Sequence, residues 1–487
     1  MKQSALKRIS IITVAFLLMF GFRFLPAPDG LSASGMQVVG IFAGVLLLWL
    51  TIAIDWPSII ALLALALIPE LRMAGILASS FGNTTFIFLM FTFVCTYALT
   101  KTSFVRKCVI WFITNKIAQK GPWHFVTLYF ASVIFVGLFI APTVLFVLFL
   151  PITEEIYKLL KLEKGNKVAA MFMMGLVVCC GLSSGMTPIA HVFPLIAMGI
   201  FQDFTGIMIS YASYMGFAIP VGIIVFILMM LLFRFVLRPN MNDINQVDVS
   251  SLSEELAPFN KNEKLIIFIF GFVVFLWVFP GIIIPAFPET ILGEIGTFID
   301  SFGWAMPPIL GVAAMAMITD QGEPLLNINE ALTKGVAWPS LMLLASTLAL
   351  GSAISNDSIG LITFLSTSIA PLVSNITPIL FVLFAVSWAA IQTNFSSGMV
   401  ASSIITTIVM TVVISVPGVN AAAVASLVGM MTAYAFATPP AMPCVAIAGA
   451  SGWTNTIQMM KYGFAIMIIS IIVSVAIGYP LASVLMG

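Results

Sequence analysis

Charged residues are scarce in this chain of 487 residues, because Asp, Glu, Lys and Arg together make up only 8% of it. A soluble domain carries about 25% charged residues, and no soluble fold could bury the 61% of residues that are apolar here. Lipid must therefore be the solvent of this protein. The low charge is spread evenly along the chain, which favours one integral membrane domain without a soluble catalytic domain. A net charge of +1 argues against a nucleic-acid partner.

Reactive side chains are also few, which limits enzyme and metal chemistry. The five cysteines stand in apolar surroundings without the spacing of metal ligands, and adjacent Cys179 and Cys180 are too constrained for an ordinary disulfide. We expect them to act as small packing residues. Asp55 and Asp357 lie near the ends of apolar runs and have no catalytic partner at a sensible spacing. We therefore expect no enzyme activity, no cofactor and no structural metal.

Apolar runs long enough to cross a bilayer, which takes about 20 residues, dominate the chain. The fold class that they predict is an all-α polytopic membrane protein with about 11 transmembrane helices and two re-entrant helical hairpins, 125–150 and 377–414. The predicted crossings are 9–25, 34–53, 57–70, 84–100, 168–201, 206–237, 264–281, 302–318, 339–355, 419–452 and 455–485.

The positive charges predict an orientation. With the N-terminus in the cytoplasm and eleven crossings, every Lys and Arg except Arg23 and Arg72 lies on the cytoplasmic side, as the positive-inside rule requires. The C-terminus is then extracellular, and the membrane is the plasma membrane. If each hairpin were instead two full crossings, the basic loops would stay on the same side of the membrane. The charges therefore do not decide whether the hairpins are re-entrant.

A short motif occurs twice, and its surroundings repeat with it. Thr187-Pro188-Ile189-Ala190 is echoed by Thr438-Pro439-Pro440-Ala441. Each copy follows, in order, an apolar helix, a short amphipathic stretch (103–117 and 358–371) and a hairpin, and each precedes a long final span. The predicted topology gives the copies opposite orientations, which is the architecture of many secondary transporters and allows alternating access. Chance similarity among apolar helices is the alternative.

The repeat divides the chain into five parts. They are N-terminal scaffold helices (1–80), a first inverted repeat (81–238), a cytoplasmic linker (239–263), further scaffold helices (264–334) and a second inverted repeat (335–487).

Four places inside the apolar runs are irregular. Irregular backbone at membrane depth must be buried in protein or must line an aqueous cavity, and broken segments at matching places in two repeats indicate the binding site of a transporter. The four places are Gly137 to Thr143, Gln392 to Gly398, Gly181 to Pro194 and Ala437 to Gly452.

The four breaks contain no Lys or Arg, so a bound anion cannot rely on a fixed strong cation. Helix N-termini can replace it, because each presents free N–H groups and about half a positive charge. Helices that start near Thr143 and Asn394 would point two such ends at one cavity, which suits a small molecule with two carboxylates. Symmetry alone does not exclude a single anionic group.

We predict ten substrate-binding residues in these breaks, each with a structural alternative. Asn394 can instead bond across helices, Thr143 can bond a carbonyl of its own helix, and the serines can simply pack between helices. Thr187, like Thr438, can shape its loop, and His191 can be a neutral hydrogen-bonded residue rather than a positive charge or a proton relay. The ten residues are Pro142, Thr143, Thr393, Asn394, Ser396, Ser397, Ser184, Thr187, His191 and Ala441.

At these residues, from Phe81 to the C-terminus, the chain resembles the divalent anion/sodium symporter (DASS) family. The family carries a Ser-Asn-Thr signature at each hairpin tip, which Ala141-Pro142-Thr143 and Thr393-Asn394-Phe395 match only in part. The resemblance implies dicarboxylate, citrate or sulfate as substrate, a homodimer, and a transport domain that moves as an elevator in the membrane lipid.

The departures from the signature bear on ion coupling. The tips and breaks of sodium-coupled members hold sodium, and hard cations need oxygen ligands. Loss of Ser and Asn at one tip, with His191 and Met442 in the breaks, favours a sodium-independent exchanger of C4/C5 dicarboxylates such as succinate, malate, fumarate or 2-oxoglutarate. A sodium-coupled symporter of dicarboxylates or other divalent anions, with sodium ions bound, is the alternative. A channel would not need an inverted repeat.

Overall fold

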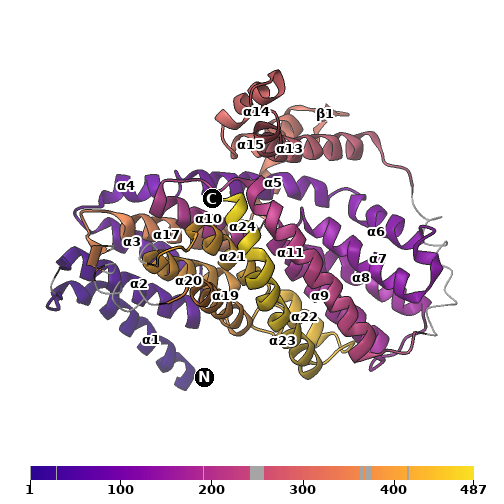
Figure 1. The fold of residues 1–487 in the computed structure, drawn as a ribbon, viewed down its shortest axis with the longest axis horizontal. Coiled ribbons are helices and arrows are strands. Elements are labelled where there is room, and N and C mark those ends of the chain that lie inside the picture. The colour runs from indigo at the N-terminus through magenta and orange to yellow at the C-terminus, as the bar shows by residue number, and fades with distance from the viewer. Residues whose placement is uncertain are drawn as a thin grey trace.

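The computed structural model describes residues 2–28, 30–189, 191–241, 257–361, 363–364, 367, 376–413 and 416–487. Helices dominate it, and one two-stranded antiparallel sheet pairs Thr319 with Pro324, so the prediction of an all-α polytopic protein is confirmed. Figure 1 shows long helices running side by side through the body of the molecule. Most of the predicted linker and part of the predicted amphipathic stretch 358–371 lie outside the described residues.

In the first half of the chain, several helices start at a side-chain cap. Side chains of Ser32, Asn83, Asn166 and Ser210 each accept a hydrogen bond from a backbone N–H in the first turn of the helix that follows, which satisfies an otherwise unpaired donor. The elements are α1 (Lys2–Gly21), η1 (Phe22–Phe24), α2 (Ala33–Thr51), α3 (Trp56–Ala66), α4 (Arg72–Ser79), α5 (Thr84–Thr100), α6 (Phe104–Thr114), η2 (Ala118–Lys120), α7 (Pro122–Gly137), α8 (Pro142–Leu159), α9 (Lys167–Met186), α10 (Val192–Thr205), α11 (Tyr211–Leu232) and η3 (Phe233–Leu237).

The second half of the chain contains a further set of helices and the two short strands. Asn260 and Glu263 form a reciprocal capping box at the start of α13. The elements are α13 (Lys261–Ala286), α14 (Ile291–Ser301), α15 (Met306–Met317), β1 (Thr319–Asp320), β2 (Glu323–Pro324), α16 (Ile328–Glu330), η5 (Ala331–Gly335), α17 (Trp338–Ser355), α19 (Pro378–Phe395), α20 (Gly398–Val413), α21 (Ala421–Ala433), α22 (Pro443–Ala450), α23 (Thr456–Val473), η6 (Ser474–Gly478) and α24 (Tyr479–Leu485).

Both predicted hairpins are present as pairs of helices that pack on each other. Hairpin 1 consists of α7 and α8, and hairpin 2 consists of α19 and α20. Pro142 is the first residue of α8, where its missing N–H costs no hydrogen bond. Likewise, each of the two predicted Thr-Pro spans is broken into two helices, α9 with α10 and α21 with α22. The four irregular places found in the sequence are therefore the ends of helices.

Several predicted crossings have other bounds in the structure. The run 57–70 is helical only over α3, which ends at Ala66. The run 302–318 is preceded by α14, an amphipathic helix that the sequence did not reveal, and α14 and α15 meet at a bend of 79°. In Figure 1, α13, α14, α15 and β1 project from one edge of the body.

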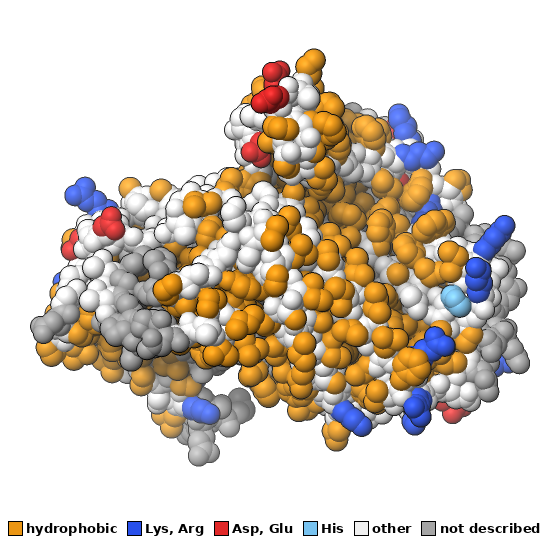
Figure 2. Space-filling view, in the orientation of Figure 1, with side chains coloured by type: hydrophobic (Ala, Val, Ile, Leu, Met, Phe, Trp, Pro, Cys, Tyr) orange, Lys and Arg blue, Asp and Glu red, His pale blue; other side chains and the backbone are white. Residues whose placement is uncertain are grey.

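The surface of the molecule is apolar enough for a membrane. In the described part of the chain, seven helices are long and apolar enough to cross a bilayer, or up to nine if each bent pair counts as one span. The predicted number of about 11 also counts α1, which is 20 residues long but is not one of these seven, the shorter helix α3, and the broken pair α21 and α22. Figure 2 shows hydrophobic side chains over most of one face, with Lys and Arg at its edges. The α9 span, by contrast, is entirely buried in protein.

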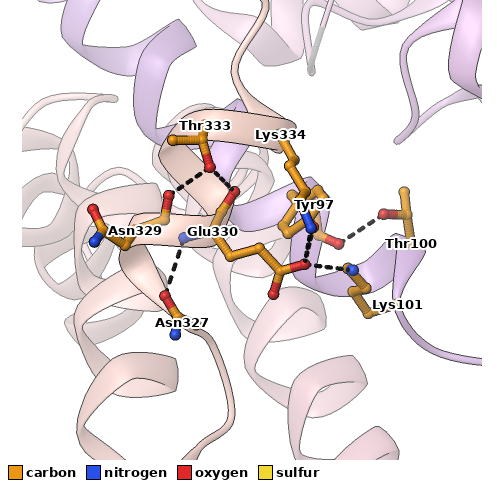
Figure 3. A network of polar contacts seen from close by, with 8 residues as sticks. All are labelled: Tyr97, Thr100, Lys101, Asn327, Asn329, Glu330, Thr333 and Lys334. Carbon is orange, nitrogen blue, oxygen red and sulfur yellow. Dashed lines mark hydrogen bonds and ion pairs between the residues drawn. The ribbon is translucent and has the colours of Figure 1, made fainter.

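A polar network joins the end of α5, in the first repeat, to α16 and η5, just before the second repeat (Figure 3). One carboxylate oxygen of Glu330 accepts hydrogen bonds from Tyr97 Oη at 2.8 Å, Lys101 Nζ at 2.9 Å and Lys334 Nζ at 3.2 Å. The bonds from Lys101, Tyr97 and Lys334 lower the pKa of Glu330 to about 2. The end of α5 is thus fastened to the segment that leads into α17, its counterpart in the second repeat.

Candidate functional site

The tip of hairpin 1 is fastened to the break between α9 and α10. Thr187 Oγ1 donates to the carbonyl of Leu138 at 2.7 Å, and His191 Nε2 lies 2.9 Å from the carbonyl of Gly137. A carbonyl can only accept, so His191 carries its proton on Nε2. Gly137 also lets the tip approach closely, because a Cβ atom there would lie 2.2 Å from Ser183 Oγ.

The tip of hairpin 2 is fastened to the break between α21 and α22, mainly through Asn394. Asn394 Nδ2 donates to the carbonyls of Ala390 at 2.8 Å and Tyr434 at 3.0 Å. Its Oδ1 accepts from the backbone N–H groups of Phe436 at 3.1 Å and Ala437 at 2.8 Å. The side chain is completely buried, and all of its hydrogen-bonding groups are used within the protein.

The two Thr-Pro motifs make equivalent hydrogen bonds in the two repeats. Thr187 donates to a carbonyl just beyond the end of α7, and Thr438 donates to the carbonyl of Asn394, near the end of α19. In both repeats, therefore, the threonine before the proline of the break neutralises an unpaired carbonyl where the first hairpin helix ends. This shared contact gives the four-residue echo in the sequence a physical meaning. Through these contacts, Thr187 and Thr438 hold the breaks against the hairpin tips.

Helices of each repeat also pack on helices of the other repeat. Helix α10 of the first repeat packs on α20 of hairpin 2, and α22 of the second repeat packs on α8 of hairpin 1. Ser402 Oγ donates to the carbonyl of Phe193 at 2.9 Å across the first contact. Across the second, the indole N–H of Trp453, just after α22, lies 3.3 Å from Glu154 of α8. This exchange of partners is what a two-fold relation between the repeats predicts.

The two broken helices cross at closely packed glycines. A Cβ atom on Gly185 of α9 would lie 2.6 Å from a ring carbon of Tyr434. A Cβ atom on Gly429 of α21 would lie 3.0 Å from the Cα of Pro194. Because these contacts join the two breaks, both hairpin tips are anchored to one central crossing.

Three of the helices that begin at the tips and breaks lack a side-chain cap. The residues before the first turns of α8, α10 and α22 are Ala141, His191 and Met442, and none of them accepts a backbone hydrogen bond through its side chain. Helix N-termini without a side-chain cap are typical positions for a bound anion. Hairpin 2 adds a fourth N-terminus, that of α20 at Gly398.

The ten predicted site residues all lie at the tips and breaks, but most face protein. Partly exposed are Thr143, Ser396 and Ser397; buried are Pro142, Thr393, Asn394, Ser184, Thr187, His191 and Ala441. Thr393 Oγ1 donates to the carbonyl of Thr432, Ser184 Oγ to that of Gly181 and Ser396 Oγ to that of Gln392. Thr143 and Ser397 keep unengaged hydroxyls among the described residues.

The helix predicted to start near Asn394 begins four residues farther along the chain, at Gly398. Asn394 lies in the last turn of α19, and the next helix begins at Gly398 after the extended residue Ser396. The two serines interrupt the helix, and Asn394 turns its amide toward the neighbouring break. The sequence shows a polar cluster but not which of its members faces which helix. Tyr434, whose carbonyl holds Asn394 and whose ring meets Gly185, was missed because nothing local distinguishes it.

Titratable side chains are sparse around the tips. His191 is buried, and its Nδ1 has no hydrogen-bond partner among the residues that the structure describes. Over the same residues, no three His, Cys, Asp or Glu side chains are grouped closely enough to hold a metal ion. An anion at this site would meet backbone N–H groups and hydroxyls.

A family model described as the sodium:sulfate symporter transmembrane region matches residues 3–487. The chain belongs to this family. Among curated relatives, the sodium-dependent dicarboxylate transporter SdcS of Staphylococcus saprophyticus is 23% identical over 476 residues, covering 94% of this chain and 88% of the relative. The SdcS protein of Staphylococcus aureus strain USA300 is also 23% identical, over 482 residues with the same coverage.

Among solved structures, the Alcanivorax borkumensis YdaH transporter is similar at a TM-score of 0.54 and 12% identity. The match covers 88% of this chain and 96% of that one, and it shows a shared fold. As a member of the sodium:sulfate symporter family, the protein is a multi-pass membrane transporter and not an enzyme.

Proposed function

We propose that this member of the sodium:sulfate symporter family exchanges C4/C5 dicarboxylates, such as succinate, malate, fumarate or 2-oxoglutarate, across the plasma membrane. The observation that carries the proposal is the meeting of two hairpin tips and two helix breaks at one crossing, where α8, α10 and α22 begin without side-chain caps. Opposed repeats of this kind support alternating access by exchange of their two conformations.

The chemistry of the tips suits a doubly charged anion. Each helix N-terminus carries about half a positive charge, and the four breaks contain no Lys or Arg. Two carboxylates can each take up N–H groups at the start of a hairpin's second helix, α8 or α20. The unengaged hydroxyls of Thr143 and Ser397 stand beside these starts. The names of the SdcS relatives support dicarboxylates as the substrate class.

The engagement of the tip carbonyls supports exchange over sodium coupling. Sodium needs oxygen ligands, and at these tips the carbonyls of Gly137, Leu138 and Asn394 already accept bonds from side chains of the breaks. An exchanger also needs an energy barrier that prevents the carrier from changing conformation while no substrate is bound. Unneutralised helix N-termini supply one, because a positive end facing lipid is unfavourable until a carboxylate binds.

Sodium-coupled symport is the second candidate. The SdcS relatives are named as sodium-dependent, and a carbonyl has two lone pairs, so an engaged carbonyl can still bind a cation. The proposal further includes an elevator movement of the hairpins, a homodimer surrounded by lipid, a cytoplasmic N-terminus and an extracellular C-terminus. The placement of Lys and Arg along the sequence supports the last two.

Counterflow in proteoliposomes tests the proposal. Sodium-free vesicles loaded with unlabelled succinate should take up labelled succinate, and vesicles without internal dicarboxylate should not. Uptake into empty vesicles that follows an inward sodium gradient would establish the symporter instead. Absence of any dicarboxylate flux, with sulfate transported, would refute the substrate class.

The Thr143→Val variant tests the site. Loss of one hydrogen bond to a charged group costs about 1.5 to 3 kcal/mol, so the apparent KM should rise roughly tenfold or more. Thr127→Val on the same hairpin is the matched control, because Thr127 Oγ1 donates to the carbonyl of Trp123 within α7. Equal KM values for the two variants would place the substrate elsewhere.

A further inference from the structure

An apolar groove lies between α6, the tip-side half of α7 and the start of α13, far along the chain from either helix break. Its volume is about 780 Å³. The walls are Phe104, Trp111 and Phe112 of α6, Phe135 of α7, Ile267 of α13 and Phe259 just before α13. Trp111 is 66% exposed. One wall therefore belongs to hairpin 1, and the opposite wall belongs to the helix that follows the linker.

The groove continues as an apolar strip along α13. Beyond Ile267, the exposed residues Phe268, Phe272 and Phe275 are four and three positions apart and therefore share one face of α13. One leaflet of the hydrocarbon core is about 15 Å deep, which is the rise of about ten helical residues. The path from the start of α13 at Lys261 to Phe272 therefore has the length of one acyl chain.

A cation marks the mouth of the groove. Lys107 lines it, and the Lys107 ammonium lies 3.7 Å from the centre of the Phe259 ring, a cation–π contact that holds the charge there. Two other lysines are paired with carboxylates, Lys101 with Glu330 and Lys261 with Asp320. Within the described residues, Lys107 forms no ion pair. The Lys107 charge also acts on the nearby carboxylate of Glu263, but the two oxygens of Glu263 accept the N–H groups of Ser103 and Asn260.

We propose that this groove binds an anionic phospholipid, with its phosphate at Lys107 and one acyl chain along Trp111, Ile267 and Phe268. The sign of the charge at the mouth selects an anionic headgroup over a zwitterionic one, and the apolar strip accepts a chain. Basic side chains beside membrane helices recognise anionic headgroups in this way. The bound lipid sits between hairpin 1 and α13. The proposal concerns binding and is independent of the transported substrate.

Fluorescence quenching tests it in the full-length purified protein. Phosphatidylglycerol with brominated acyl chains is titrated into the protein in detergent, and brominated phosphatidylcholine is the comparison lipid. The protein has nine tryptophans, so the Trp111 signal is the difference between the wild-type protein and Trp111→Phe. We expect Trp111 to be quenched at lower concentrations of phosphatidylglycerol than of phosphatidylcholine.

The Lys107→Gln variant isolates the headgroup contact. A basic side chain near an anionic surface contributes about 1 kcal/mol, so this variant should reduce the preference for phosphatidylglycerol about fivefold. Lys116→Gln is the matched control, because Lys116 is exposed at the end of the same segment but does not line the groove. Lys107→Arg should retain the preference.

Three outcomes would overturn the proposal. The first is equal quenching of Trp111 by the two lipids in the wild-type protein. The second is an unchanged preference in Lys107→Gln. The third is protection of Trp111 from both lipids, which would mean that another part of the chain or a second copy fills the groove.

Discussion

Replacement of Asn394 by Ala should destabilise the protein instead of merely weakening substrate binding. The amide of Asn394 is wholly buried and makes four hydrogen bonds, two to carbonyls and two from backbone N–H groups. Alanine removes all four and leaves Phe436 N–H, Ala437 N–H and the carbonyl of Tyr434 without these partners. Hairpin 2 then loses most of its polar attachment to the break between α21 and α22.

The magnitude follows from the number of bonds. A net contribution of about 0.5 to 1.5 kcal/mol per hydrogen bond gives a loss of about 2 to 6 kcal/mol for the four together. Asn394→Asp is the graded variant, because it keeps the acceptors for Phe436 and Ala437 but loses both donors, and an isolated buried charge adds a cost of its own. Gln392→Ala is the control, since Gln392 lies on the same helix and is only partly buried.

Two measurements on purified protein separate the structural role from a ligand role. We expect a clearly lower unfolding temperature for Asn394→Ala without substrate, and an unchanged one for Gln392→Ala. Succinate should raise the unfolding temperature of the surviving folded variant as it does for the wild-type protein. An Asn394→Ala protein with wild-type stability but without response to succinate would refute this reasoning and make Asn394 a direct ligand.

Three further changes have defined outcomes. Glu330→Gln should lower the unfolding temperature at neutral pH. The pKa of Glu330 is about 2 in the folded protein, below its ordinary value of 4.5, so the stabilisation by the ionised carboxylate is complete above pH 4.5 and is lost as the pH falls toward 2. The difference in unfolding temperature between wild type and variant should therefore shrink over that pH range. Gly185→Ala should cost about 1 to 3 kcal/mol through overpacking against Tyr434, whereas Gly75→Ala, with open space around it, should be tolerated, as urea unfolding will show. Thr187→Val removes one hydrogen bond, worth about 1 kcal/mol, and should speed hydrogen exchange at the hairpin 1 tip.

Much of the architecture was accessible from sequence because hydrophobic length and chain breakers act locally. Pro142 begins α8 and the Ser396-Ser397 pair separates α19 from α20, close to where the polar interruptions lie in the apolar runs. The echo of Thr187-Pro188 at Thr438-Pro439 correctly indicated equivalent positions in two repeats. The amphipathic helix α14 escaped notice because it has only 11 residues and Glu294 and Asp300 interrupt its apolar residues, so the sequence shows no long apolar run there.

What the sequence determined by itself was a lipid-embedded, internally repeated chain with four breaks, since length, hydropathy and proline act through the local backbone. Only the tertiary structure decided which polar groups of those breaks remain available. Asn394 and Thr438 meet across 44 residues of chain, and Thr187 and Leu138 across 49. Such pairings depend on how helices cross, which no local pattern encodes. They engage Asn394, Thr393 and Thr187 in hydrogen bonds within the protein, whereas the hydroxyls of Thr143 and Ser397 have no such partner among the described residues.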